Sequence, residues 1–275
     1  MTTAMKSRII LHISCGLLLQ AALLIPTSLG TNQVIEIDQS PMTVDLEEMK
    51  VPLNIRQSVI EGDLSIRTHK LQQLIIMVEG VDEDDSDQEQ KVFLIVDAAT
   101  GRISLSLDGD FADSDVEWVV PESASLSIQT TDGDITVEGL QGDIDCSSMD
   151  GTIELTDISG RVSAATEDGD ILVSLNHRIS TRPISVSTED GDIELELPAN
   201  PNVKISASTM DGDIYCDFPI GSGFKPDPDS HNQSVWKSLF DERKLIGVLG
   251  QGSLPIQLST LDGDITIIRS DNEQN

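Results

Sequence analysis

The chain has 275 residues, of which 48 are Asp or Glu and only 17 are Lys or Arg, so its formal net charge is −31. A surface this acidic repels nucleic acid and anionic lipid, and it favours cations or basic partners. Aromatic residues make up only 3% of the chain, so any core must be aliphatic, and few rings are present on which bases or sugars could stack.

Residues 1–30 have the layout of a secretory signal peptide. Two basic residues precede an apolar stretch from Ile9 to Ile25, and small residues stand at Ser28 and Gly30. We therefore expect cleavage after Gly30. We then expect the mature chain to be exported to the periplasm, the cell surface or the medium.

Two other interpretations of this segment are open. An uncleaved anchor needs about 20 apolar residues, and His12 and Gln20 shorten the apolar run below that length. We therefore expect no transmembrane segment in the mature chain. A lipoprotein would be acylated on Cys15, but the apolar run continues beyond this cysteine.

Residues 31–119 are expected to form a less regular β region that caps the rest of the fold. The segments Val34–Ile37, Leu74–Val78 and Val92–Val96 have the composition of strands. The acidic stretch Asp82–Gln90 between the last two is expected to be a solvated loop.

Residues 120–269 contain an internal repeat. The tetrapeptide Asp-Gly-Asp-Ile recurs, with the variant Asp-Gly-Thr-Ile in one copy and a more degenerate copy at Asp108–Phe111. The copies begin at Asp132, Asp150, Asp168, Asp190, Asp211 and Asp262. Their glycines are 18, 18, 22, 21 and 51 residues apart, and Gly142 and Gly160 divide the first two intervals in half.

Apolar residues keep fixed places around each central glycine, seven and five positions before it and two and four positions after it. Around Gly133 these residues are Leu126, Ile128, Ile135 and Val137. Such alternation predicts two half-buried strands joined by the Asp-Gly turn. The Ser and Thr residues within 129–131, 147–148, 163–166 and 185–188 are expected on the exposed face.

Two folds can be built from this unit, and both are all-β. In an antiparallel meander or sandwich, each Asp-Gly would form a tight hairpin turn. In a β-solenoid, each repeat of 18–22 residues is one rung of two strands, and the rungs stack in parallel. The fixed register of apolar sites favours the solenoid, because every rung then presents the same inward side chains.

Segment 217–254 is predicted to be an insertion that leaves the repeat domain at a corner. Within it, Ser234–Lys244 could form a short helix, and Leu245–Leu249 could extend a strand. Residues 270–275 follow the last repeat as a polar tail.

A resemblance to a known family lies in the same region. The stretch Val120–Leu126, the motif Thr131–Ile135 and the closing stretch Gly250–Ile265 resemble the putative adhesin family of repeat domains found in bacterial envelope proteins. The resemblance implies a β-solenoid in the cell envelope. It implies no catalytic set and names no ligand, because members of that family are mostly of unassigned function.

The Asp-Gly-Asp turns are the sharpest candidate for chemistry. In a solenoid their aspartates would line one edge, where Ca²⁺ could lie among clustered carboxylate and carbonyl oxygens. The residues concerned are Asp132, Asp134, Asp168, Asp170, Asp190, Asp192, Asp211 and Asp213. The alternative is that Asp and Gly are simply turn residues. The glycine order typical of calcium-binding nonapeptide solenoids is absent, so we assign no metal ligands.

Cys146 and Cys216 occupy apolar positions of the repeat, which favours two buried thiols, although export would also permit a disulfide. No catalytic residues or cofactors are assigned, because no acidic cluster stands apart from the repeat. The sequence therefore predicts a non-enzymatic envelope or secreted module that binds an unknown protein or polysaccharide. The alternatives are a calcium-stabilised surface binding protein and a carbohydrate-active solenoid enzyme.

Overall fold

The computed structural model describes residues 11–13, 33–37, 41–46, 52–79, 92–97, 99–107, 114–176, 182–218, 234–236 and 243–270. Within these ranges every regular element is a strand, so the all-β prediction is confirmed. None of the described residues forms a helix that is long and apolar enough to cross a membrane.

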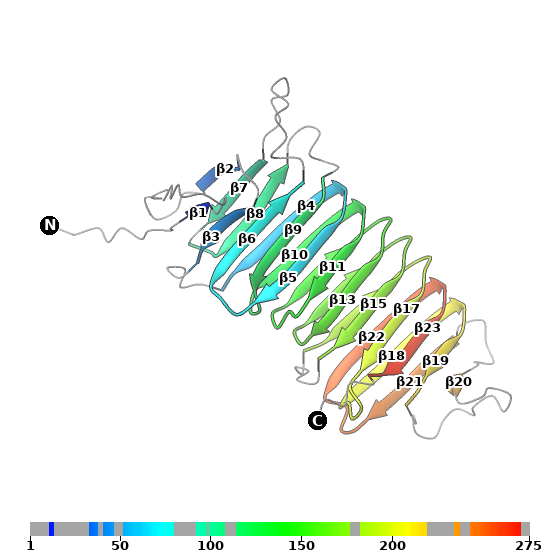
Figure 1. The fold of residues 1–275 in the computed structure, drawn as a ribbon. Helices are drawn as coiled ribbons and strands as arrows, with labels where there is room; N and C mark the ends of the chain where they lie inside the picture. The colour runs from blue at the N-terminus through cyan, green and yellow to red at the C-terminus, as the bar shows by residue number, and fades with distance from the viewer. Residues whose placement is uncertain are drawn as a thin grey trace.

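The strands form two sheets that face each other along an elongated stack (Figure 1). The first, called sheet A, contains in spatial order β1 (Leu11–Ile13), β3 (Met42–Asp45), β6 (Gln73–Val78), β9 (Val116–Pro121), β5 (Leu64–His69), β11 (Ile135–Glu138), β13 (Ile153–Ile158), β15 (Ile171–Leu175), β17 (Ile193–Leu197), β23 (Ile265–Arg269), β19 (Ile214–Cys216) and β20 (Ser234–Trp236).

The second, called sheet B, contains in spatial order β2 (Gln33–Ile37), β7 (Val92–Asp97), β8 (Arg102–Leu107), β4 (Asn54–Glu61), β10 (Ser125–Asp132), β12 (Ile144–Ser147), β14 (Val162–Ala165), β16 (Ile184–Ser187), β22 (Leu254–Asp262), β18 (Val203–Asp211) and β21 (Arg243–Leu249). Each rung contributes one strand to each sheet, as β12 and β13 do.

Neighbouring rungs pair in parallel, so the predicted solenoid is confirmed and the antiparallel meander is wrong. Ile144 of β12 is level with Leu126 and Val162, and Ile153 of β13 is level with Ile135 and Ile171. Equivalent positions of the sequence repeat therefore lie side by side on neighbouring strands. Neither sheet closes on itself.

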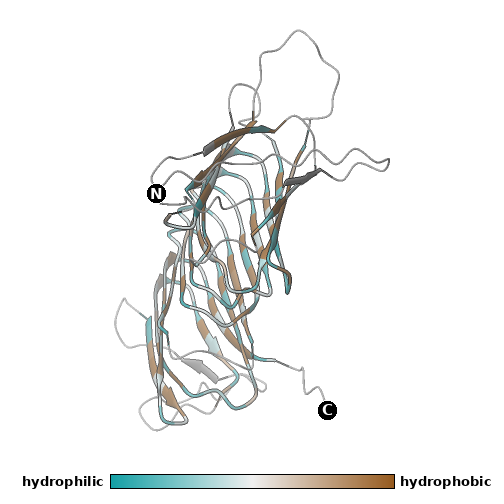
Figure 2. Cartoon of the chain, turned by 90° about the vertical axis from the view of Figure 1, so that its left-hand side faces the viewer, coloured by the Kyte–Doolittle hydropathy of each residue, from teal (hydrophilic) through white to brown (hydrophobic). Residues whose placement is uncertain are grey.

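The core is the aliphatic interior between the two sheets. Along most strands of the repeat, brown apolar positions alternate with teal polar ones (Figure 2), and the alternating apolar positions point inward. The four fixed sites around Gly151, namely Ile144, Cys146, Ile153 and Leu155, are all at most 2% exposed. Burial of this aliphatic surface is the main favourable contribution to folding.

The rungs do not stack in the order in which they occur in the chain. The last rung, β22 and β23, lies between the rung of β16 and β17 and the rung of β18 and β19. At the other end, the rung of β4 and β5 lies between that of β8 and β9 and that of β10 and β11. Both sheets therefore run continuously across residue 120, where the sequence suggested a division.

Antiparallel strands end the stack on both sides. In sheet A, β6 pairs antiparallel with β9, and β20 pairs antiparallel with β19; in sheet B, β7 pairs with β8 in this way, and β21 with β18. The predicted strand Leu245–Leu249 lies in β21. The predicted helix is wrong in its described part, because Ser234–Trp236 is strand β20 and Arg243 begins β21.

Several predicted segments lie outside the described residues. They include the signal peptide apart from the short strand β1, the acidic loop Asp82–Gln90, the degenerate repeat copy Asp108–Phe111 and the tail beyond Ser270. The cleavage site after Gly30 stays a prediction.

Glycine is required where neighbouring rungs touch at the Asp-Gly turns. Gly169 has a φ of +150°, and a Cβ atom placed on it would lie 2.4 Å from the carbonyl oxygen of Gly151. The same approach recurs at Gly191, whose added Cβ would lie 2.1 Å from the carbonyl oxygen of Gly169. A side chain at either position would separate the rungs.

We therefore expect Gly169→Ala to lower the free energy of unfolding by about 2 kcal/mol or more, through backbone strain and the backbone clash. Denaturant unfolding followed by circular dichroism measures this. Ser174→Ala, an outward substitution in the same rung, should stay within about 0.5 kcal/mol of the wild type. Equal stability of the two variants would show that the rungs do not touch at this corner.

Candidate functional site

The Asp-Gly corner, defined as the edge of the stack where the Asp-Gly turns join sheet B to sheet A, holds a ladder of aspartates. In most rungs the Asp that follows the glycine accepts a hydrogen bond on Oδ1 from a backbone N–H of the next rung. The ladder begins at Asp115, which follows Ser114, and ends at Asp213, which accepts from Arg243. The N–H of Asp192 donates to Asp170 over 2.8 Å, and the N–H of Asp264 donates to Asp192 over 2.7 Å. The ladder consists of Asp115, Asp63, Asp134, Asp170, Asp192, Asp264 and Asp213.

This ladder explains why Asp recurs after the glycine. A backbone N–H at a turn needs an acceptor, and a charged carboxylate is a stronger acceptor than a neutral one. At one end of the ladder Arg243 pairs with Asp213 and also donates to the carbonyl of Gly212. The aspartates therefore hold neighbouring rungs together at the turn.

The ladder has one interruption, at Thr152. The N–H of Thr152 donates to Oδ1 of Asp134 over 2.7 Å, so the residue keeps the donor function of the position. It carries no carboxylate to offer to the next rung. The variant tetrapeptide Asp-Gly-Thr-Ile therefore continues the aspartate ladder on one side only, although its rung pairs with both neighbours.

A second ladder, which the sequence analysis missed, lies just inside the corner. It consists of buried hydroxyl residues three positions before each central glycine, none more than 6% exposed: Thr130, Ser148, Thr166, Thr188, Thr260 and Thr209. Thr188 donates to the carbonyl of Gly169 over 3.0 Å, and Thr260 donates to the carbonyl of Gly191 over 3.0 Å. The expectation that Thr130, Ser148, Thr166 and Thr188 lie on an exposed face is therefore wrong.

The sequence analysis also missed one copy of the turn. Glu61 is level with Asp132, and Leu64 is level with Ile135, so Glu61-Gly62-Asp63 occupies the same corner as the Asp-Gly-Asp turns. The added Cβ of Gly133 would lie 2.2 Å from the carbonyl oxygen of Gly62. The glycine, with Asp63 after it, was the signal that could have identified this rung.

Calcium binding at the corner was an alternative in the sequence analysis, and no metal ligands were assigned. Across the part of the chain that the structure describes, no three His, Cys, Asp or Glu side chains are grouped closely enough to hold a metal ion. Every ladder carboxylate except Asp213, which pairs with Arg243, already accepts a backbone N–H on one oxygen. Calcium would therefore have to bind through the remaining oxygens.

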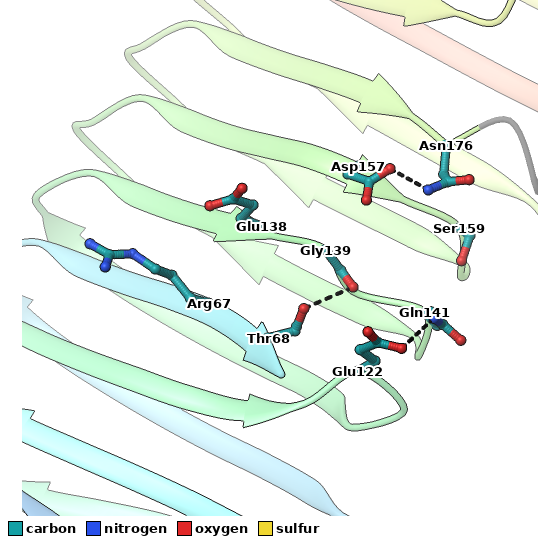
Figure 3. Close-up of a pocket in the computed structure, with 9 residues that line it drawn as sticks. All are labelled: Arg67, Thr68, Glu122, Glu138, Gly139, Gln141, Asp157, Ser159 and Asn176. Atoms are coloured by element: carbon teal, nitrogen blue, oxygen red, sulfur yellow. Dashed lines mark hydrogen bonds between the residues drawn. The ribbon is translucent and has the colours of Figure 1, made fainter. Parts of the chain in front are cut away.

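A shallow polar cavity of about 460 Å³ lies at the opposite corner, where sheet A strands end and the chain returns to sheet B (Figure 3). A β-bulge in β13 places Asp157 at a φ of +58° beside it. Its lining residues lie on β5, β11 and β13 and in the turns that follow β9, β11, β13 and β15. They are Arg67, Thr68, Glu122, Glu138, Gly139, Gln141, Asp157, Ser159 and Asn176.

Most polar groups in this cavity already bind one another. Thr68 donates to the carbonyl of Gly139 over 3.0 Å, and Gln141 donates to Glu122 over 2.7 Å. Asn176 donates to Asp157. The lining supplies no Cys, His or Lys and no hydroxyl hydrogen-bonded to a carboxylate, so it contains no activated nucleophile of the usual kind. The hydrogen bonds of this cavity therefore serve to hold the turns of neighbouring rungs together.

Cys146 and Cys216 are buried free thiols, as predicted. Cys146 faces inward from sheet B and Cys216 from sheet A. Burial disfavours the thiolate and raises the pKa of both groups, that of Cys216 to about 11. Neither thiol is suited to nucleophilic chemistry near neutral pH.

These features define a class of protein: an open β-solenoid of parallel two-strand rungs, with turn chemistry repeated from rung to rung. The chain belongs to the Toastrack DUF4097 family, which matches residues 61–268. This membership confirms the predicted resemblance to a family of repeat domains of unassigned function.

Two solved structures are similar to the chain. A putative cell adhesion protein from Clostridium sporogenes is 10% identical, covering 87% of this chain and 99% of its own, with a TM-score of 0.43. A putative adhesin from Bacteroides fragilis is also 10% identical, covering 86% and 97%, with a TM-score of 0.26. No curated protein matches the sequence.

The aspartate ladder can be tested at Asp192. We expect Asp192→Ala to lower the free energy of unfolding by about 1 kcal/mol, because the N–H of Asp264 loses its acceptor. Asp192→Asn keeps an acceptor oxygen and should retain most of that stability. Chemical denaturation measures both. Equal losses in the two variants would contradict the hydrogen-bonding role.

The same unfolding measurement in calcium, in magnesium and in chelator, at matched ionic strength, tests the corner as an ion site. A shift unique to calcium that Asp192→Asn removes would establish calcium binding. Equal small shifts with both cations would indicate charge screening alone.

Thiol accessibility gives a third prediction. In a Cys15→Ser variant, Cys146 and Cys216 should not react with Ellman's reagent at pH 8 until the protein is unfolded, because both thiols are buried and protonated. The raised pKa also means that burial of Cys216 contributes fully to stability below its ordinary pKa of 9.0, and that this contribution falls as the pH rises toward 11. Rapid reaction of the folded protein would contradict this.

Proposed function

We propose that this protein is an exported, non-enzymatic interaction module that attaches to a surface ligand outside the cytoplasm. The observation that carries the proposal is the structural use of the repeated residues. The aspartates, glycines and buried hydroxyls of the turns bind neighbouring rungs, which leaves the broad outer faces of the two sheets for recognition.

Three further features support this function. The N-terminal segment has the layout of a secretory signal. The similar solved structures are named a cell adhesion protein and an adhesin. A stacked solenoid also suits attachment, because recognition by such folds uses an extended surface instead of an enclosed pocket.

The absence of enzymatic activity is part of the proposal. A polysaccharide-cleaving solenoid would need one pair of carboxylates set apart as acid and base. In the described part of this chain the ladder carboxylates of the Asp-Gly corner recur in nearly every rung, and all but Asp213 accept a backbone hydrogen bond. Asp213 is distinguished by its ion pair with Arg243 at the end of the ladder, but it is a single carboxylate and not an acid–base pair.

Export and attachment can be tested with the full chain. Expressed in a bacterium, the protein should be recovered outside the cytoplasm with Thr31 as its first residue, whereas a variant with Leu18→Arg and Leu19→Arg should stay inside with its N-terminus intact. The exported protein should then bind bacterial cells saturably. Cytoplasmic retention of the wild type would contradict export, and absent or unsaturable binding would contradict attachment.

A further inference from the structure

The outer faces of the two sheets differ sharply in charge. Away from both corners, sheet A carries four outward carboxylates between β9 and β19: Glu117, Glu154, Glu194 and Glu196. In the same rungs sheet B carries one, Asp145. The other exposed carboxylates on the strands of sheet B lie at the Asp-Gly corner, where β4, β10, β18 and β22 end: Glu61, Asp132, Asp211 and Asp262. The protein's negative charge is therefore concentrated away from the outer face of sheet B.

Two rows of side chains, mostly serine and all uncharged except Asp145, cross that face in register. The first row contains, in spatial order, Ser127, Asp145, Ser163, Ser185, Gln257 and Ser206. The second contains Gln129, Ser147, Ala165, Ser187, Ser259 and Ser208. We call these two rows the serine face. All of these side chains are exposed or half-buried.

The composition of the serine face does not follow from the fold alone. The same rungs supply the same number of outward rows to sheet A, where Glu, Thr, Leu, Tyr, Ile and a single Ser, Ser174, occupy them. Strand β22 joins the stack out of chain order, yet its Gln257 and Ser259 continue both rows. Both sheets experience the same stacking constraints, so a difference confined to one outer face points to a use of that face.

A cation extends each row at one end. Arg56 is level with Ser127, and Lys244 is level with Ser208, while Ser58 and Ile246 extend the other two ends. Between β10 and β18 the face covers about 24 Å, from a spacing of about 4.8 Å between strands. It is a long, flat, hydroxyl-rich strip that an uncharged partner can approach without desolvating a row of carboxylates.

We propose that the serine face binds an uncharged linear polysaccharide that lies along the stack and crosses the rungs. This inference rests on the proposed attachment function and names the ligand and the face. Serine hydroxyls and glutamine amides donate and accept hydrogen bonds, as sugar hydroxyls do. A polymer that contacts many rungs makes many weak contacts at once, and together these give a higher overall affinity than any one contact.

A protein partner fits this face less well. Protein interfaces are depleted in Ser and depend on buried Trp, Tyr or Arg anchors. The two rows contain no aromatic residue and no Arg. An anionic polymer would meet the long-range repulsion of a protein with a net charge of −31.

The test measures retention of the exported full-length protein on insoluble cellulose, chitin and starch, with a polygalacturonate gel as the anionic comparison. We expect saturable retention on at least one of the three uncharged polymers and little on the gel. Soluble fragments of the retained polymer should compete better as their length approaches that of the face. Added salt should change retention little.

Matched variants locate the site. Ser163→Glu with Ser187→Glu should reduce retention by about tenfold or more, because many weak contacts are lost together. Thr156→Glu with Ser174→Glu adds the same charges to sheet A in adjacent strands and should leave retention within about twofold. Ser163→Ala with Ser187→Ala gives a smaller loss without added charge, and circular dichroism checks the folding of every variant.

Three outcomes overturn the inference: retention on none of the uncharged polymers, retention on polygalacturonate alone, or equal losses in the sheet B and sheet A variants. If the protein still binds cells saturably, any of these results leaves the proposed attachment function intact. It rejects only the assignment of the ligand as a polysaccharide or of the serine face as the binding site. Loss of cell binding as well removes both.

Discussion

Close contact between glycines of neighbouring rungs is the constraint on which the rest of the structure depends. Each central glycine lies against the carbonyl of the glycine before it in the stack, too close for any side chain. This contact holds the rungs at strand spacing at the corner. Both sheets can then pair in parallel, the inward aliphatic residues can align, and the aspartate and threonine ladders can form.

The corner also shows how so acidic a chain forms a regular stack. Carboxylates placed one above another repel, and part of that cost is offset because all the ladder aspartates except Asp213 accept a backbone N–H from the next rung. Inside the turn, buried hydroxyls donate to the glycine carbonyls of the neighbouring rung. The turn sequence is therefore explained by hydrogen bonding between rungs, and recognition is left to the outer faces.

The two faces have different consequences for function. Sheet A carries most of the outward carboxylates, which favour solubility and repel other acidic surfaces. Sheet B presents small hydroxyls and amides over several rungs. A protein with this asymmetry can stay dispersed through one face while the other approaches an uncharged surface, which is the basis of the polysaccharide proposal.

The sequence alone determined the rung, because alternation of period two and the recurring glycine report local geometry directly. It also identified the buried cysteines from their place in the register. It could not give the order of the rungs, since the position of β22 between β16 and β18 depends on pairing between segments far apart in the chain. Nor could it separate the inward Thr188 from the outward Ser187: at the turn, polar residues stand on both sides of the strand, and only the tertiary structure shows which carbonyls the buried hydroxyls must satisfy.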